Sequence, residues 1–277
     1  MMLRNRFLII CSLLVWGFLA VHAQERQHSW MVGGGSANIL DTYLSPYAYQ
    51  GTDLRFLRET QRRVSRPNLL GGDAPTFQTL LDVDMGIVES PAKNVDEYTV
   101  GVRYSMAWLH PIPLNLRCLS LQAGPMASGY LGGIYNERNG NNPGQAKADI
   151  ALELTLQAGT DFRLPRWMRI VREPLHARCQ LMVPVAGLAF SPNFGQSYYE
   201  MFELDDYDHN IVFATPFNAP SARWQLTLDV PLHAERSATC LRLGYGGTVM
   251  QSTFNHLRYH SYTHTFMIGV TKSFRKL

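Results

Sequence analysis

The chain has 277 residues, of which 46% are hydrophobic and 11% aromatic, and its formal net charge is +3 at pH 7. This charge is too small to indicate a nucleic-acid partner, so none is expected. Beyond the N-terminus, no uninterrupted apolar run is long enough for a membrane-spanning helix. The composition therefore leaves two all-β classes open, a water-soluble two-sheet sandwich and a membrane β-barrel.

The N-terminus has the pattern of a secretory signal peptide. Arg4 and Arg6 precede an apolar run over residues 7–21, and the small residue Ala23 follows. We expect cleavage after Ala23, so that residues 1–23 are a signal peptide and the chain is exported. A membrane anchor is the less favoured alternative, because the run is short for a span of about 20 residues.

The mature chain, residues 24–277, is a succession of segments in which apolar and polar residues alternate. Side chains alternate between the two faces of a strand, so each segment predicts a strand with one apolar face. The predicted strands cover residues 29–44, 54–62, 77–87, 98–108, 117–134, 149–159, 176–190, 224–232, 241–249 and 264–274. Ten strands in one antiparallel barrel is the prediction, and twelve strands is the alternative left open.

The polar faces of these strands carry charges of both signs, whereas the apolar faces carry none over the centre of several strands. This contrast favours a barrel with an ionic interior over a sandwich. Tyr98 and Trp108 share an apolar face ten residues apart, which is about 25 Å of height in a strand tilted by about 40° and matches two aromatic girdles. The residues predicted to form an ion-pair network in the lumen are Asp82, Asp84, Arg103, Glu153, Arg178, Asp229 and Arg242.

The last strand predicts how the barrel closes. Phe266, Ile268 and Val270 share one face, and Phe274 lies three residues before the end of the chain. A barrel in lipid must pair its last strand with its first, because an open edge would leave backbone groups without partners. We therefore expect outer-membrane lipid around the barrel and recognition of this strand by the barrel-assembly machinery.

Two stretches resemble a family of uncharacterised outer-membrane β-barrels that is known only as a domain of unknown function. One is residues 38–46 together with Gly51, and the other is the terminal strand over 266–274. The resemblance extends over the mature chain. It implies a location in the outer membrane of Gram-negative bacteria, and it supplies no established activity and no catalytic residues.

Three residues in the long polar segment 191–222 are the candidates for catalysis. Ten-stranded outer-membrane proteases place two acidic residues opposite an Asp and a His at the outer rim. Asp206, Asp208 and His209 suit such a site, but adjacent residues diverge in a strand. A hydrolase of this kind or a lipid hydrolase is therefore the alternative hypothesis, and a narrow channel is another.

No cofactor or metal is predicted. His260 and His264 share a face but stand about 13 Å apart in a strand, too far for joint ligation of a metal. The three cysteines of the mature chain, Cys118, Cys179 and Cys240, are interpreted as buried packing thiols, with one disulfide as the alternative.

The leading functional hypothesis from the sequence is therefore a non-enzymatic barrel. Its lumen is expected to be plugged by its own charged side chains, and segment 191–222 is expected to be an extracellular loop that binds a partner.

Overall fold

The computed structural model describes residues 23–64, 74–114, 118–140, 142–165, 173–233 and 238–275. The predicted signal peptide lies outside these residues except for Ala23, so its cleavage remains a prediction.

Most of the described chain is strand, as the alternating pattern predicts. The strands are β1 (Ala23–Asp41), β2 (Tyr49–Val64), β3 (Thr76–Glu89), β4 (Asp96–Ile112), β5 (Ser120–Asn136), β6 (Gly144–Phe162), β7 (Leu175–Phe190), β8 (Ile211–Ala214), β9 (Ser221–His233), β10 (Ala238–Phe254) and β11 (Leu257–Arg275). One short helix, α2 (Tyr198–Glu203), precedes β8. No helix among the described residues is long and apolar enough to cross a bilayer.

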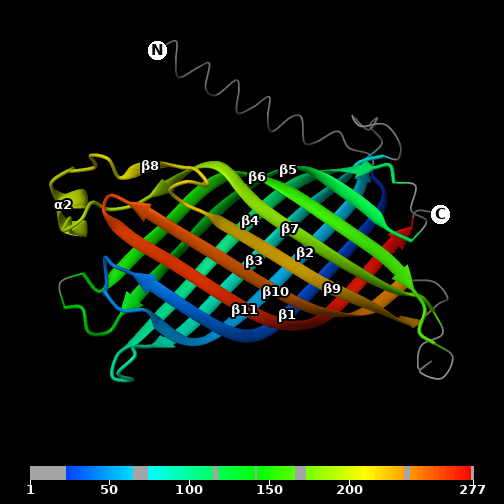
Figure 1. Ribbon diagram of the computed structural model, residues 1–277, viewed down its shortest axis with the longest axis horizontal. Coiled ribbons are helices and arrows are strands. Elements are labelled where there is room, and N and C mark those ends of the chain that lie inside the picture. Colours follow the sequence, from blue (N-terminus) through cyan, green and yellow to red (C-terminus); the bar gives the residue numbers. More distant parts are fainter. Residues whose placement is uncertain are drawn as a thin grey trace, which may run out of the picture.

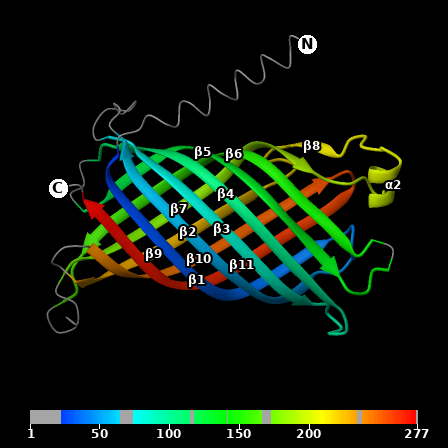
Figure 2. The same cartoon turned by 180° about the vertical axis from the view of Figure 1, so that it is seen from behind.

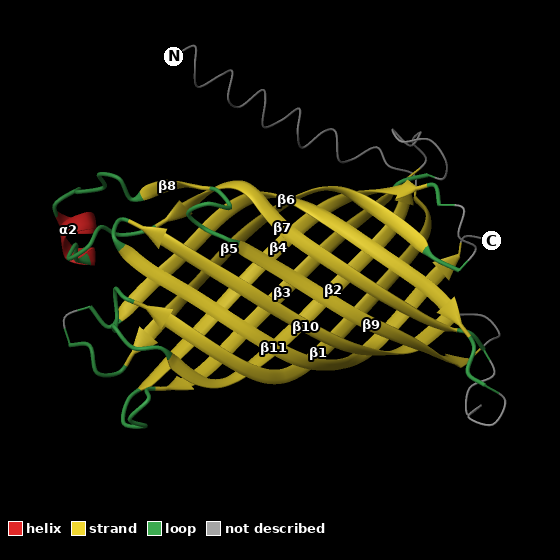
Figure 3. Cartoon of the chain, viewed as in Figure 1, coloured by secondary structure: helices red, strands yellow, loops and turns green. Residues whose placement is uncertain are grey.

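The strands form a closed antiparallel barrel (Figures 1 and 3). Every strand of the ring pairs with its neighbours along the chain, and β11 pairs with β1 in a continuous ladder that includes Trp30 opposite Val270. Ten of the described strands make the ring, and β8 is an extra strand beside β7. The predicted ten-stranded barrel, closed by its last strand, is confirmed.

The ring order places β2 and β7 opposite each other. In one direction the order is β2, β1, β11, β10, β9, β7, and in the other it is β2, β3, β4, β5, β6, β7. The helix α2 and β8 mark one end of the barrel, which we call the distal end (Figure 1). The start of β1 and the end of β11 lie at the other, terminal end (Figure 2).

The outer surface of the barrel is apolar. On β6, Ile150, Leu152 and Leu154 are about 60% exposed, at 61%, 61% and 59%, whereas Glu153 between them is 1% exposed. Strand β4 shows the same contrast, with exposed Val100 and buried Arg103. The backbone groups of these strands are paired in the ladders, and the apolar side chains face outward. This arrangement is that of a transmembrane barrel, whose outer side chains contact hydrocarbon.

The interior is only partly ionic, in contrast to the predicted charged lumen. Three clusters of buried apolar side chains lie among the polar ones. The first is formed by Ala37, Ile39, Leu44, Tyr49, Val88, Val95 and Ile134 at the distal ends of their strands, the second by Leu80, Ala107, Leu109, Met126 and Met182, and the third by Met31, Leu57 and Met267. Small barrels fill their interior with side chains, and this one fills it with both kinds.

The segment 191–222 contains more secondary structure than predicted, because its sequence shows no alternation of apolar and polar residues. It contains α2 and β8, and β9 begins at Ser221. Ser197 caps α2 and forms a reciprocal capping box with Glu200, a signal that a search for alternation does not detect.

The three described cysteines are free thiols, and the expectation that they are buried is wrong. Cys118 and Cys179 are exposed and Cys240 is half-buried. Cys179 follows the inward-facing Arg178, so its side chain belongs to the outer, apolar face of β7, where a small apolar thiol is tolerated.

Candidate functional site

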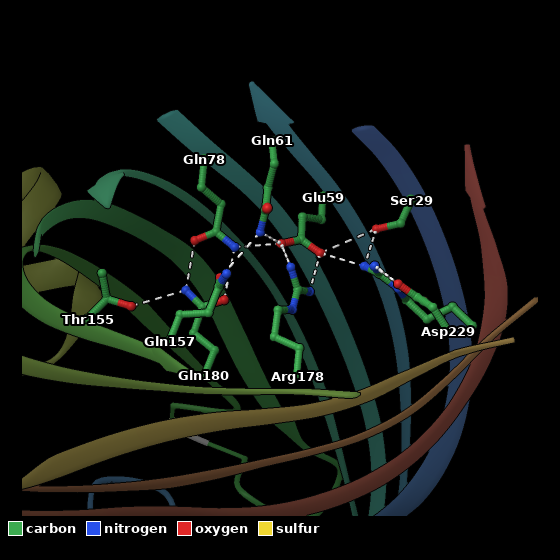
Figure 4. A network of polar contacts seen from close by, with 10 residues as sticks. Ser29, Glu59, Gln61, Gln78, Thr155, Gln157, Arg178, Gln180 and Asp229 are labelled. Atoms are coloured by element: carbon green, nitrogen blue, oxygen red, sulfur yellow. Dashed lines mark hydrogen bonds and ion pairs between the residues drawn. The ribbon is translucent and has the colours of Figure 1, made fainter. Parts of the chain in front are cut away.

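Glu59 of β2 lies at the centre of a polar network inside the barrel. It is 2% exposed, and Arg178 of β7 donates hydrogen bonds of 2.7 and 2.5 Å to its two carboxylate oxygens. Because β2 and β7 lie opposite each other, this pair crosses the lumen directly (Figure 4).

The second arginine of the network joins two carboxylates. Arg242 of β10 donates to Glu59 at 2.7 Å and to both oxygens of Asp229 at 2.6 Å. It also donates to the Ser29 hydroxyl at 3.0 Å. Two carboxylates and two guanidinium groups therefore neutralise one another in a row across the barrel, which satisfies the requirement that buried charges be paired.

Glutamines extend the network along the wall (Figure 4). Gln78 of β3 donates to Glu59 and exchanges hydrogen bonds of 2.9 and 2.7 Å with Gln180 of β7. Gln180 also donates to Thr155 at 3.1 Å, and Gln61 donates to Glu59 and Gln157. Both Gln78 and Gln180 are fully buried, so side chains occupy the section of the lumen at this level.

A second set of ion pairs lies nearer the distal end. Arg103 donates to both oxygens of Asp149 at 3.0 and 3.1 Å. Arg223 of β9 donates to both oxygens of Glu153 at 2.8 and 2.7 Å. Arg55 pairs with Asp82.

Among the residues predicted for the lumen network, Asp84 differs from the others. Asp82, Arg103, Glu153, Arg178, Asp229 and Arg242 each form an ion pair between described residues. Asp84 forms no hydrogen bond or ion pair within the described chain, although it lines a small lumen cavity beside Asp53 and Asp82. That it joins the network therefore stays a prediction.

Sequence reasoning missed several members of the networks. Glu59 and Arg55 lie in a strand whose other face also carries charge, for example at Arg58, so no apolar face marked their orientation. Arg223 precedes the predicted start of its strand, yet it shares the parity of Asp229 and continues that face. Extending the alternation by one residue would have found it.

The candidates for catalysis lie in segment 191–222, which we call the distal loop, and their side chains point to solvent. Asp208 Oδ1 is 2.9 Å from His209 Nδ1, and these side chains are 77% and 78% exposed. Asp206 is exposed as well. Asp82, by contrast, is buried in the lumen with Arg55.

The distal loop is fastened to the barrel by specific hydrogen bonds. The Tyr43 hydroxyl donates to the Gln196 carbonyl at 2.9 Å, and Asn255 Nδ2 donates to the carbonyls of Ser191 and His209 at 3.1 and 3.0 Å. Burial, with the nearby Tyr198, raises the pKa of Tyr43 to about 12. The loop is therefore held against the rim while Tyr43 is protonated.

The loop presents aromatic and acidic side chains outward. Phe194, Tyr199 and Phe202 are 73%, 66% and 63% exposed. Acidic residues surround them at positions 200, 203, 205, 206 and 208. Hydrogen bonds from Ser197 lower the pKa of Glu200, so this carboxylate stays ionised as the capping group of α2.

No cluster of three or more His, Cys, Asp or Glu side chains that could hold a metal occurs among the described residues.

Residues 7–277 match the family described as "Protein of unknown function (DUF3316)". The chain belongs to this family. The resemblance seen in its sequence is thereby confirmed, and the DUF3316 description assigns no activity to it. No curated protein matches the chain.

Several solved structures are similar to this DUF3316 chain. The outer membrane protease OmpT of Escherichia coli is 8% identical, with a TM-score of 0.47 over 92% of this chain and 99% of that one. The transport unit of the autotransporter AIDA-I from Escherichia coli is 9% identical, with a TM-score of 0.49 over 92% of each chain. The translocator domain of the autotransporter NalP from Neisseria meningitidis is 11% identical, with a TM-score of 0.40 over 98% and 95%.

Proposed function

We propose that this protein is a non-conducting β-barrel of the outer membrane that binds a partner through its distal loop. In this proposal the distal end faces the cell exterior and the chain termini face the periplasm. Its role is binding and not catalysis.

The membrane location is supported by the outer surface of the barrel. Exposed aliphatic side chains cover the middle of β4 and β6, and the ring closes because β11 pairs with β1. An apolar surface of this extent would be unfavourable in water and is favourable in hydrocarbon.

The closed lumen is supported by one observation above all, the pair of Glu59 and Arg178. Side chains from opposite strands are joined at 2.7 Å, and Gln78 and Gln180 form a second bridge beside them. Water and solutes would have to break these buried bonds in order to pass.

The binding role is supported by the shape and chemistry of the distal loop. A loop that is already fastened loses little conformational entropy on binding, and exposed aromatic side chains are frequent anchors of protein interfaces. The acidic residues around Tyr199 and Phe202 favour a partner that presents Lys or Arg beside apolar groups.

Peptide display against the purified barrel tests this role. Peptides selected on the wild-type protein are expected to be basic and aromatic, and to lose about tenfold or more in affinity when Tyr199 and Phe202 are both replaced by Ser. Replacing the lipid-facing Ile150 and Leu154 by Val is the matched control and should change nothing. Equal affinity for the wild-type and loop variants would contradict the proposal. So would a peptide- or lipid-hydrolysing activity that is lost when Asp206, Asp208 or His209 is replaced.

A further inference from the structure

The wall of the barrel is interrupted between β7 and β9. Strand β7 pairs with β9 only from His176 to Met182, and with β8 only from Gly187 to Phe190. Residues 183–186 therefore have no ladder partner on this side. They lie within β7, which pairs with β6 on its other side from Leu175 to Ala189.

The interruption arises because the chain leaves β7 between β8 and β9. On β7, the gap between the residues that pair with β8 and those that pair with β9 is only residues 183–186. The connection over residues 215–222 is longer than this gap, and it bends away from β7 toward β10. There the amide groups of Gln251 and Thr253 donate to the carbonyls of Pro220 and Asn218 at 3.1 and 2.9 Å. These hydrogen bonds give the backbone of β10 partners at this level, whereas residues 183–186 of β7 keep no ladder partner on the same side.

Strand β7 is itself irregular at this point. Its register with β6 shifts, so that Glu153 lies opposite Pro184 and Leu152 opposite Ala186, with Val185 as the extra residue of a bulge. Proline has no N–H group, which reduces the number of backbone donors left without a ladder partner. Strand β7 is therefore irregular along both edges here, with a bulge against β6 and a gap in pairing between β8 and β9.

A pocket of about 110 Å³ fills this opening, which we call the wall window. Its lining includes residues that face the lumen, such as Arg103 and Arg223, and residues that are exposed on the outer surface, such as Val185 and Leu188. The wall window therefore connects the lipid-facing surface with the interior.

The lining of the wall window is apolar along the strands and positively charged toward the lumen. Ala186, Gly187 and Ala189 supply small apolar groups. The charged lining residues are Lys147, Arg103, Arg223 and Asp149. The other two carboxylates that pair with these cations, those of Asp41 and Glu153, do not line the pocket.

Two of these cations keep unused hydrogen-bond donors. Lys147 Nζ contacts one carboxylate oxygen, of Asp41 at 2.6 Å, and lies 4.1 Å from the centre of the Tyr259 ring, so one of its three N–H donors is still unused. Arg223 binds Glu153 through Nη2 alone, and the described residues offer no acceptor to its Nη1 or Nε. Both groups can therefore donate to an anion without losing their present partners.

We propose that the wall window binds a single-chain amphiphile with a carboxylate head group, such as a free fatty acid, which enters from the membrane. The hydrocarbon chain lies in the opening between β7 and residues 215–222. The head group receives a hydrogen bond from Lys147, and Arg223 adds positive charge to the lumen side of the pocket.

Photolabelling tests this site on the full barrel in phosphatidylcholine nanodiscs. The probe is laurate that carries a diazirine near the end of its chain. Labelled peptides are expected to cover residues 184–190 and 214–223, and unlabelled laurate should displace the probe. Labelling spread evenly over the exposed strands, without displacement, would overturn the proposal, because it would indicate only ordinary annular contact.

Two kinds of variant distinguish the contribution of the head group to binding from that of the hydrocarbon chain. Lys147→Gln removes one donor cation and is expected to reduce labelling about tenfold. Lys93→Gln, the same change on an exposed loop, is the control and should leave it unchanged. Ala219→Trp fills the pocket and should abolish labelling, whereas Ala92→Trp on a distant loop should not.

Competition with other head groups completes the test. Dodecanol, which lacks the charge, should displace the probe about tenfold less well than laurate. Dodecyl phosphate serves as the second anionic competitor, and it is expected to bind no better than laurate. Equal displacement by dodecanol and laurate, or full labelling of a folded Lys147→Gln variant, would overturn the assignment of an anionic ligand.

Discussion

At the scale of single residues, the interior depends on how completely Glu59 is satisfied. Two arginines and two glutamines surround a carboxylate that water does not reach. Arg178 forms no second ion pair with the described residues, whereas Arg242 keeps Asp229 if Glu59 is lost. The network is therefore most sensitive at the Glu59–Arg178 pair.

Replacing Glu59 by Gln is expected to destabilise the barrel by about 3–5 kcal/mol, because it leaves the buried charge of Arg178 unpaired. The free energy of unfolding in urea, measured with the barrel in lipid vesicles, checks this. Asp208→Asn is the matched control on an exposed ion pair and should change the free energy by less than about 0.5 kcal/mol. A Glu59→Gln barrel as stable as the control would show that Arg178 finds another partner.

The sequence predicted a residue as facing the lumen only where the opposite face of its strand is clearly apolar. Arg103, Glu153 and Arg178 were predicted as lumen residues because apolar neighbours defined the outer face. Glu59 was not, because Arg58 interrupts the outer face of the same strand. Pairing across the lumen depends on barrel closure and stagger, which a single strand does not encode.

At the scale of elements, the distal loop acts as one folded unit. The capped helix α2, the strand β8 and the contacts of Tyr43 and Asn255 hold it on the rim. The Tyr43 contact requires a protonated hydroxyl, because only this form donates to the Gln196 carbonyl.

The pH dependence of loop docking follows from the raised pKa of Tyr43. Its contribution is fully present below pH 10, the ordinary value of a tyrosine, and is lost as the pH rises through about 12. Tyrosine ring-carbon NMR of the labelled barrel should show one resonance that titrates near 12 and is missing in Tyr43→Phe. The variant should weaken docking by about 1 kcal/mol at neutral pH. Titration of Tyr43 near 10 would contradict the account.

The sequence placed the ring strands correctly but not their ends: the strands predicted over 241–249 and 264–274 cover Ala238–Phe254 and Leu257–Arg275 in the structure. The tight turn between β10 and β11 consists of Asn255 and His256, with φ values of 49° and 63°. Positive φ at both central residues is the geometry that matches strand twist in a two-residue hairpin. His rarely marks such a turn, so the sequence indicated a longer connection. The detour of residues 215–222 was invisible for a different reason, because it is defined by contacts with β10.

At the scale of the whole molecule, the alternation of side chains separates two environments. One face of each strand meets lipid and the other meets a filled interior, and the closed ring leaves no edge. The same ring sets β2 against β7, which is why the Glu59–Arg178 pair crosses the lumen. Between β7 and β9 the wall departs from this plan and opens onto a pocket.

The most direct test of the closed interior is single-channel recording of the purified barrel in a planar lipid bilayer. The wild-type protein is expected to insert without steady conductance, because the Glu59–Arg178 and Gln78–Gln180 bridges occupy the lumen. A variant with Gln78, Arg178 and Gln180 replaced by Ala, if it still inserts as a folded barrel, should conduct. Steady, large openings of the wild-type barrel would contradict the account.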